Sequence, residues 1–186
     1  MALTATMVHL QVTLSDVDRG VYEELDLRVA RHPSESARYM LTRVLAYALS
    51  FEEGIAFSKG GLSDPEEPAV AVRDLTGALV AWIDVGAPSA ERLHKATKAA
   101  RRVTVFTHQD RAALLREVGS RPVHKLEQIA FWLLPPAFLG ALEPHVGRNT
   151  RLELVRTDGQ LYATVGSATV EGSVTLATLT PADLAR

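Results

Sequence analysis

Polar and apolar side chains alternate in the N-terminal part of the chain. Between positions 7 and 14, every even-numbered position carries valine or leucine. A period of two predicts a strand with one buried face. Turn-forming residues at 15–20 separate this stretch from a second apolar series between Tyr22 and Val29. The pattern therefore predicts an antiparallel β-hairpin.

Helical spacing replaces alternation after Pro33. Apolar residues recur at intervals of three and four over 36–51, which predicts an amphipathic helix. Pro33 disfavours helical backbone at His32, and Ser34 can cap the N-terminus of the helix that follows. Glu35 is then expected in the first turn, where an acidic side chain complements the helix dipole.

Strands and helices alternate through the middle of the chain. The predicted segments are strands at 78–85, 103–107 and 126–134, helices at 89–101 and 110–118, and a short helix from Pro135-Pro136 to Leu142. This order predicts an α/β or α+β fold with a mixed central sheet flanked by helices. Turns at Asp158-Gly159 and Glu171-Gly172 predict a β-meander over 151–180, which we expect to share a second, antiparallel layer with the first hairpin.

Length and composition limit the kind of protein. The 186 residues, 47% of them hydrophobic, fit a single domain over 1–186. The absence of cysteine excludes disulfides, thiol chemistry and cysteine-ligated zinc. With no run of about 20 apolar residues and no signal-peptide pattern, we expect a cytoplasmic protein outside the membrane. The net charge of −2 means that a nucleic-acid partner needs a local basic patch. Nothing in the pattern indicates an oligomeric state.

One acidic residue interrupts an apolar strand. Asp84 lies near the end of the segment 79–86, and a basic helix containing Arg92, Lys95 and Lys98 follows it. Burying a carboxylate is costly unless it is paired, hydrogen-bonded or bound to a metal. Two interpretations follow. Asp84 forms an ion pair with Arg92 or Lys95, or it binds a divalent metal ion together with another acid at a phosphate-binding site.

Basic residues form two candidate phosphate sites. Arg31, His32 and Ser34 precede the first predicted helix, where free main-chain N–H groups bind anions, although an ordinary helix cap explains them as well. The basic helix described above carries Arg92 and Lys98 on a shared face. Such a face is typical either of phosphate contacts or of a plain solvated surface.

Several phrases of the sequence together resemble the YaeQ family of bacterial proteins. In chain order they are Met1-Ala2-Leu3-Thr4-Ala5-Thr6, Ala30-Arg31-His32-Pro33-Ser34-Glu35, Glu67-Pro68, Trp82-Ile83-Asp84-Val85-Gly86-Ala87-Pro88, Arg92 and Lys95-Ala96. Their order and spacing are similar to the family from residue 1 to about 134, and the C-terminal hairpins match in pattern. The phrases are specific as a set, although each one alone is short.

That family is similar in fold to the PD-(D/E)XK nucleases, a group named for metal-dependent DNA cleavage. The resemblance implies a restriction-endonuclease-like core over 34–107. It also implies that Asp84 is the acid of the third core strand and that Glu35 is the helix acid. The upstream acid would be Glu67 or a neighbour, Asp64 or Glu66, in the acidic loop 59–68. By the same resemblance, Glu67 and Asp84 would bind Mg²⁺ or Mn²⁺, and Lys95 would assist the attacking water.

The sequence departs from the nuclease pattern at two places. Gly86 occupies the position of the usual lysine, so Lys95 would have to reach the site from the next helix. In Glu67-Pro68 the acid stands before the proline instead of after it. Two functions are therefore expected as alternatives. One is metal-dependent hydrolysis of nucleic acid, with Arg92 and Lys98 on the phosphate backbone. The other is a non-catalytic module on the same scaffold that binds nucleic acid or a protein partner.

Overall fold

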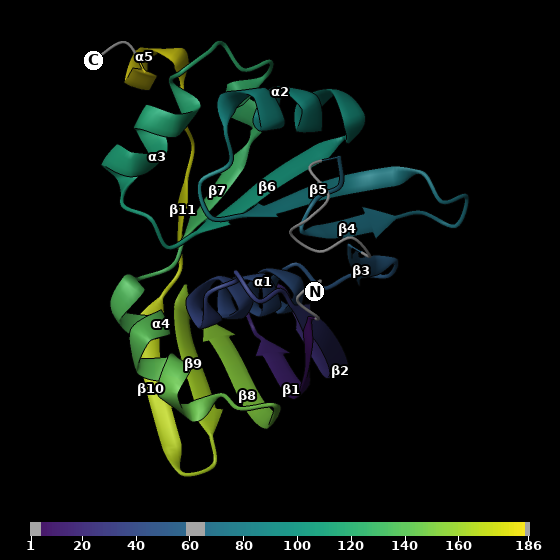
Figure 1. Cartoon of the computed structure of the whole chain (residues 1–186), viewed down its shortest axis with the longest axis vertical. Coiled ribbons are helices and arrows are strands. Elements are labelled where there is room, and N and C mark those ends of the chain that lie inside the picture. The colour runs from purple at the N-terminus through teal and green to yellow at the C-terminus, as the bar shows by residue number, and fades with distance from the viewer. Residues whose placement is uncertain (1–4, 59–65, 185–186) are drawn as a thin grey trace. The chain divides into compact units, whose positions relative to one another are not determined.

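The structure is a computed structural model, and it describes residues 5–58 and 66–184. The chain has an α+β fold in which the strands form two mixed sheets (Figure 1). Contacts divide it into two compact units. The first unit contains Met1–Phe51 and Leu134–Thr175, and the second contains Glu52–Leu133 and Leu176–Arg186.

The first unit contains a five-stranded sheet in the order β10-β9-β8-β1-β2. β1 (Thr6–Asp16) and β2 (Val21–Arg31) are antiparallel neighbours along their whole length, which confirms the predicted hairpin. Their apolar side chains are buried on one face, because successive residues of a strand point to opposite sides. The buried members are Val8, Leu10, Val12, Leu14, Leu25, Leu27 and Val29.

Helix α1 spans Ala37–Leu49, and its N-cap lies two residues after the predicted cap, Ser34. Ser36 is its N-cap, because the Ser36 hydroxyl accepts a hydrogen bond from the Tyr39 N–H at 3.1 Å. The prediction that Ser34 caps the helix is therefore wrong, and so is the prediction that Glu35 lies in the first turn. The helix itself lies where the apolar spacing predicts it.

The C-terminal strands complete this sheet. They are β8 (Asn149–Thr157), β9 (Gln160–Val165) and β10 (Ala168–Ser173). As predicted, they form a meander, with a turn at Asp158-Gly159 between β8 and β9. β8 runs parallel to β1, however, with a register that starts at His9↔Asn149. The layer is therefore mixed, and the prediction of an antiparallel layer is wrong.

The turn predicted at Glu171-Gly172 lies inside β10. The chain turns at Gly166 instead, where the φ of 61° suits glycine. Gly172 faces α4 (Pro136–Leu142), and a β-carbon at this position would lie 2.7 Å from the ring of Phe138. Glycine is needed here because a helix approaches the strand closely, and not because the chain reverses direction.

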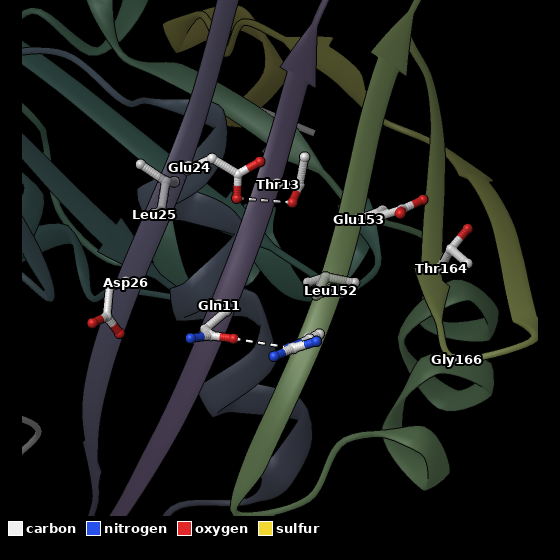
Figure 2. A pocket seen from close by; sticks show the side chains of 10 residues that line it. Gln11, Thr13, Glu24, Leu25, Asp26, Leu152, Glu153, Thr164 and Gly166 are labelled. Atoms are coloured by element: carbon white, nitrogen blue, oxygen red, sulfur yellow. Dashed lines mark hydrogen bonds between the residues drawn. The ribbon is translucent and has the colours of Figure 1, made fainter.

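The other face of this sheet is polar. Figure 2 shows Gln11, Thr13, Glu24 and Glu153 on neighbouring strands, with helices behind the sheet. These side chains line a hollow of about 560 Å³. The Thr13 hydroxyl donates to Glu24 at 3.0 Å, and Arg151 Nε donates to Gln11 at 3.1 Å. Because these polar groups bond to one another, we interpret the face as a solvated sheet surface.

The second unit contains a six-stranded sheet in the order β11-β7-β6-β5-β4-β3. Its strands are β3 (Ile55–Phe57), β4 (Val70–Arg73), β5 (Leu79–Val85), β6 (Arg102–Thr107), β7 (Ala130–Leu133) and β11 (Thr175–Ala177), and its helices are α2 (Ala90–Ala99), α3 (Arg111–Val118) and α5 (Pro181–Leu184). β5, β6 and β7 are parallel, whereas β3, β4 and β5 are antiparallel neighbours. The predicted mixed sheet is thus confirmed.

Trp82 lies at the centre of the second unit's core. It is buried together with Leu93, Val105, Leu114 and Phe131, which come from α2, α3 and two neighbouring strands. Trp82 is only 1% exposed, so it packs in the core and is not available to stack on a base.

The segment predicted as one strand over 126–134 is divided. A single turn of 3₁₀-helix at Leu126–Gln128 precedes the shorter strand β7. Lys125, just before this turn, has a left-handed φ of 53°, a conformation that periodicity does not reveal. None of the helices within the described ranges is long and apolar enough to cross a membrane.

Candidate functional site

The strand acid lies where β5 passes into α2. Gly86 ends the strand with a φ of 86°, a conformation that other residues rarely adopt. Ser89 caps α2 by accepting a hydrogen bond from the Arg92 N–H at 3.2 Å. Arg92 therefore lies in the first turn, and helical side chains lean toward the N-terminus of their own helix. Its guanidinium is thus directed toward the end of β5, where Asp84 is buried.

Asp84 and Arg92 form a buried bidentate ion pair. Asp84 is only 2% exposed. Arg92 donates from Nε to Oδ2 and from Nη2 to Oδ1 of Asp84, and both distances are 2.8 Å. Two parallel N–H···O bonds match the planar arginine fork to a carboxylate. Of the ion pairs that the sequence left open, the structure contains the one with Arg92.

Arg92 also joins β5 and α2 to the acidic loop. Its Nη2 donates a second hydrogen bond to the main-chain oxygen of Glu67 at 2.7 Å. Its guanidinium carbon lies 5.3 Å from the ring centroid of Trp82, within the range of a cation–π contact. Trp82 and Asp84 point to the same side of the sheet because they are two residues apart on one strand. One side chain therefore holds a loop, a strand and a helix together.

The other residues predicted at the metal site have partners of their own. The Glu67 carboxylate accepts a hydrogen bond from the Ser58 hydroxyl at 2.9 Å, and it lies 3.9 Å from Nη2 of Arg73. The ammonium group of Lys95 pairs with the carboxylate of Glu66. Glu67 and Lys95 are therefore paired with residues other than Asp84.

The donor set around Asp84 does not fit a resident divalent metal ion. Mg²⁺ is bound through oxygen ligands such as carboxylates, and both oxygens of Asp84 already accept hydrogen bonds from a guanidinium. Within residues 5–58 and 66–184, no group of three or more His, Cys, Asp or Glu side chains is arranged to hold a metal ion. Asp64 of the acidic loop lies outside the described residues. Binding of Mg²⁺ or Mn²⁺ by Glu67 and Asp84 stays a prediction.

Glu35 belongs to the first unit, where it forms another buried ion pair. It is 3% exposed, and its Oε2 accepts hydrogen bonds from Arg43 Nη2 at 3.0 Å and from the His32 N–H at 3.1 Å. Its Oε1 is buried and has no hydrogen-bond partner among the described residues. Burial raises the pKa of Glu35 above its usual value, and the charge of Arg43 opposes that rise only in part.

The predicted phosphate residues lie close together before α1: Arg31 is the last residue of β2, and His32 and Ser34 lie in the turn that follows. The His32 Nδ1 is 2.6 Å from the Ser34 hydroxyl, and the Ser34 N–H donates to the same nitrogen at 3.2 Å. Arg31 Nε donates to the main-chain oxygen of Glu35 at 3.0 Å. Ser34 is thus bonded within the turn, whereas the guanidinium of Arg31 is oriented by only one of its nitrogens.

A basic surface that the sequence revealed only in part surrounds the C-terminal end of α2. This α2 basic surface consists of His94, Lys98, Arg101, His124 and Lys125. Lys98 follows His94 by one helical turn, and the rings of His94 and His124 are 6.3 Å apart. Arg101 and Lys125 line one small hollow. The left-handed backbone at Lys125 places that residue here, and no motif in the sequence marked it.

Known proteins of similar sequence carry one family name. The chain matches the family model described as YaeQ protein over residues 1–174. It is 30% identical over 177 residues to the uncharacterized protein YaeQ of Escherichia coli (strain K12), covering 94% of this chain and 97% of that protein. It is also 30% identical over 163 residues to the uncharacterized protein YaeQ of Salmonella typhi, covering 87% of this chain and 90% of that protein.

Solved structures of similar fold carry the same family name. The crystal structure of YaeQ protein from Pseudomonas syringae superimposes with a TM-score of 0.83 and 27% sequence identity, covering 95% of this chain and 97% of that chain. The crystal structure of YaeQ protein from Xanthomonas axonopodis pv. citri gives a TM-score of 0.81 and 27% identity, covering 95% and 100%. The family model, the sequence relatives and the shared fold agree, and the chain belongs to the YaeQ family.

Proposed function

We propose that this chain is a non-catalytic nucleic-acid-binding module on a nuclease-like scaffold. The observation that carries the proposal is the bidentate pairing of Asp84 with Arg92. A guanidinium bonded to both oxygens of an aspartate offsets the negative charge that would attract a metal ion and occupies one acceptor site on each oxygen. A fold does not dictate an activity, so the scaffold can serve binding without cleavage.

Arg92 has a structural role in this proposal. Its contacts to Asp84, to the main chain of Glu67 and to Trp82 fix the acidic loop beside the end of β5. Freeing both oxygens of Asp84 for a metal ion would require Arg92 to break its two hydrogen bonds to that carboxylate. The nuclease alternative therefore needs a rearrangement, whereas the binding alternative uses the arrangement as it stands.

The α2 basic surface is the proposed contact for the phosphate backbone. Lys98, Arg101 and Lys125 are exposed and supply three positive charges. The Thr76 hydroxyl and, less strongly, Arg101 keep the pKa of Asp74 below its usual value, so an ionised Asp74 offsets part of the charge of Arg101. Contacts of this kind position a nucleic acid without reading its bases. We therefore expect weak binding with little sequence preference.

Fluorescence anisotropy with labelled duplex DNA, single-stranded DNA and RNA tests the binding. Three phosphate contacts predict a slope of about −2.7 in a plot of log K against log salt for duplex DNA. Replacing Lys98, Arg101 or Lys125 with alanine should each make that slope shallower by about 1. Arg116→Ala is the matched control, because Arg116 is an exposed arginine at the end of α3 without a hydrogen bond or ion pair to any described residue.

A cleavage assay separates the two alternatives. With Mg²⁺ or Mn²⁺ added, we expect the protein to leave DNA and RNA intact. Metal-dependent cleavage that disappears in Glu67→Gln and Lys95→Ala would overturn the non-catalytic proposal in favour of the nuclease. Failure to bind any of the three nucleic acids at low salt would instead favour the module that binds a protein partner.

A further inference from the structure

A hollow of about 330 Å³ lies in the first unit, between the first residues of β1, the start of α1 and the segment before β8. Its apolar wall includes Val8, Met40 and Leu41, which are buried in the core. Its polar rim includes Arg31, His32 and Arg148. Ligand sites in proteins typically combine a largely apolar wall with a few convergent polar groups, at volumes from about 300 Å³ upward.

The basic groups of this rim are available to a ligand. Arg31 is held by the hydrogen bond from its Nε to the main-chain oxygen of Glu35, and its charge also acts on the buried Glu35 carboxylate. Its terminal nitrogens make no hydrogen bond or ion pair with any described residue. The side chain of Arg148 makes no hydrogen bond or ion pair with any residue in the described ranges. The one carboxylate of the rim belongs to Glu143, and it lies 3.8 Å from Nη2 of Arg38. Positive charge on the rim therefore exceeds negative charge.

Arg148 also lines a neighbouring hollow of about 390 Å³. That hollow includes His9, Arg28 and Asn149, which the strand register places in one row across β2, β1 and β8. His9 is paired with Asp26, but Arg28 has no described partner. The positive region thus continues from the first hollow onto the sheet, with Arg148 common to both.

We propose that the hollow between Arg31 and Arg148 binds a phosphomonoester on an apolar body, of the size of a nucleoside monophosphate. A phosphomonoester carries a charge between about −1.5 and −2 at neutral pH and offers three acceptor oxygens. Two arginine forks suit such a group, because each can donate two parallel hydrogen bonds to it. The apolar wall would pack against the apolar body of the ligand. This site lies in a different unit from the α2 basic surface, so the proposed phosphomonoester site and the proposed nucleic-acid contact can be tested independently.

Isothermal titration calorimetry on the full chain tests the site with AMP, adenosine and inorganic phosphate as probes. We expect saturable binding of AMP, with adenosine and inorganic phosphate each bound at least tenfold more weakly. Arg148→Ala should weaken AMP binding by about tenfold or more, since a lost charge-assisted contact of that strength corresponds to such a factor. Arg148→Lys should restore part of the affinity. Because the Arg148 side chain is exposed and bonds to no described residue, we expect the variant to fold, and circular dichroism checks this.

Three results would overturn the proposal. One is the absence of saturable AMP binding at millimolar concentration. Another is equal binding of AMP and adenosine, which would show that the phosphate is not recognised. The third is a loss of AMP affinity in Arg148→Ala that is no larger than the loss in the control Arg116→Ala. The DNA-binding salt slope of Arg148→Ala should stay that of the unmodified chain, which keeps this test separate from that of the α2 basic surface.

Discussion

Arg92 reaches both carboxylate oxygens of Asp84 from the first turn of the helix that follows the strand. Asp84 is only 2% exposed and accepts a hydrogen bond at each oxygen, so its role differs from that of an aspartate at a solvated strand end. Two charges paired with good geometry in the interior are tolerated, whereas one left alone is strongly destabilising. The stability of the second unit therefore depends on Asp84, the same residue that the resemblance to nucleases predicts as a metal ligand.

Loss of Arg92 should destabilise the protein. We expect Arg92→Ala to lower the free energy of unfolding by about 3 kcal/mol, because it leaves Asp84 buried without its partner. The lower end of the usual range applies, since the Arg92 side chain is 25% exposed. Arg92→Lys should also be less stable than the unmodified chain, because a lysine cannot make two parallel hydrogen bonds. Urea unfolding measures both changes.

The double variant Asp84→Asn/Arg92→Gln checks the mechanism of that loss. It removes both charges, so it should be more stable than Arg92→Ala despite carrying two substitutions. Arg116→Ala should change the stability by no more than about 0.5 kcal/mol. A stability change of that small size in Arg92→Ala would contradict the structural role of the pair.

The contribution of Glu35 to the free energy of unfolding should decrease as pH rises. Burial raises the pKa of Glu35 in the folded state above its usual value of 4.5, despite Arg43. The unfolded chain then ionises first as pH rises. The contribution of Glu35 to stability is thus fully present below about pH 4 and is lost as pH rises through the folded pKa. The difference in stability between Glu35→Gln and the unmodified chain should therefore shift in favour of glutamine between pH 4 and 7.

Urea unfolding of the two proteins at several pH values measures that difference. The matched control is Glu171→Gln, which replaces an exposed glutamate on β10 of the same unit and should show no such trend. A shift in favour of glutamate as pH rises would mean that the attraction of Arg43 outweighs burial.

Gly172 should not accept a larger side chain. A β-carbon there would lie 2.7–2.8 Å from three atoms of Phe138, so Gly172→Ala forces the helix or the ring to move. We expect a loss of about 1–3 kcal/mol in the free energy of unfolding, which is typical of overpacking. Gly147→Ala is the control, because its β-carbon would meet nothing within 4 Å. Combining Gly172→Ala with Phe138→Leu should recover part of the loss, and equal losses at the two glycines would contradict the contact.

Divalent metal ions should leave the thermal stability unchanged. A ligand present at 100 times its Kd stabilises a folded protein by about 2.7 kcal/mol, which raises the Tm measurably. Because both oxygens of Asp84 are engaged by Arg92, we expect no difference in Tm between millimolar Mg²⁺ or Mn²⁺ and a chelator. A metal-dependent rise in Tm that is absent in Glu67→Gln would support the predicted metal site instead.

Local patterns predicted the elements well because secondary structure leaves a periodic signal. The alternation of β1, the helical spacing of α1 and the order of strands and helices around Asp84 all depend on neighbours within a few positions. Errors arose where one residue type has two uses. Glycine occurs both in turns and at close contacts between elements, so the pattern at Gly172 predicts a turn where the structure has a close contact. Serine both caps helices and bonds within turns, so the sequence predicts a cap at Ser34 although Ser36 is the N-cap.

By itself, the sequence determined a mixed helix-and-strand fold, the family and the buried character expected of the segment around Asp84. Tertiary structure alone decided which cation neutralises that acid, because Arg92 and Lys95 lie on the same short helix and only packing brings one of them to the end of β5. It likewise decided that β8 lies parallel to β1 and that Arg148 shares a hollow with Arg31. Pairings between residues more than a hundred positions apart depend on how whole elements pack, and no local period encodes them.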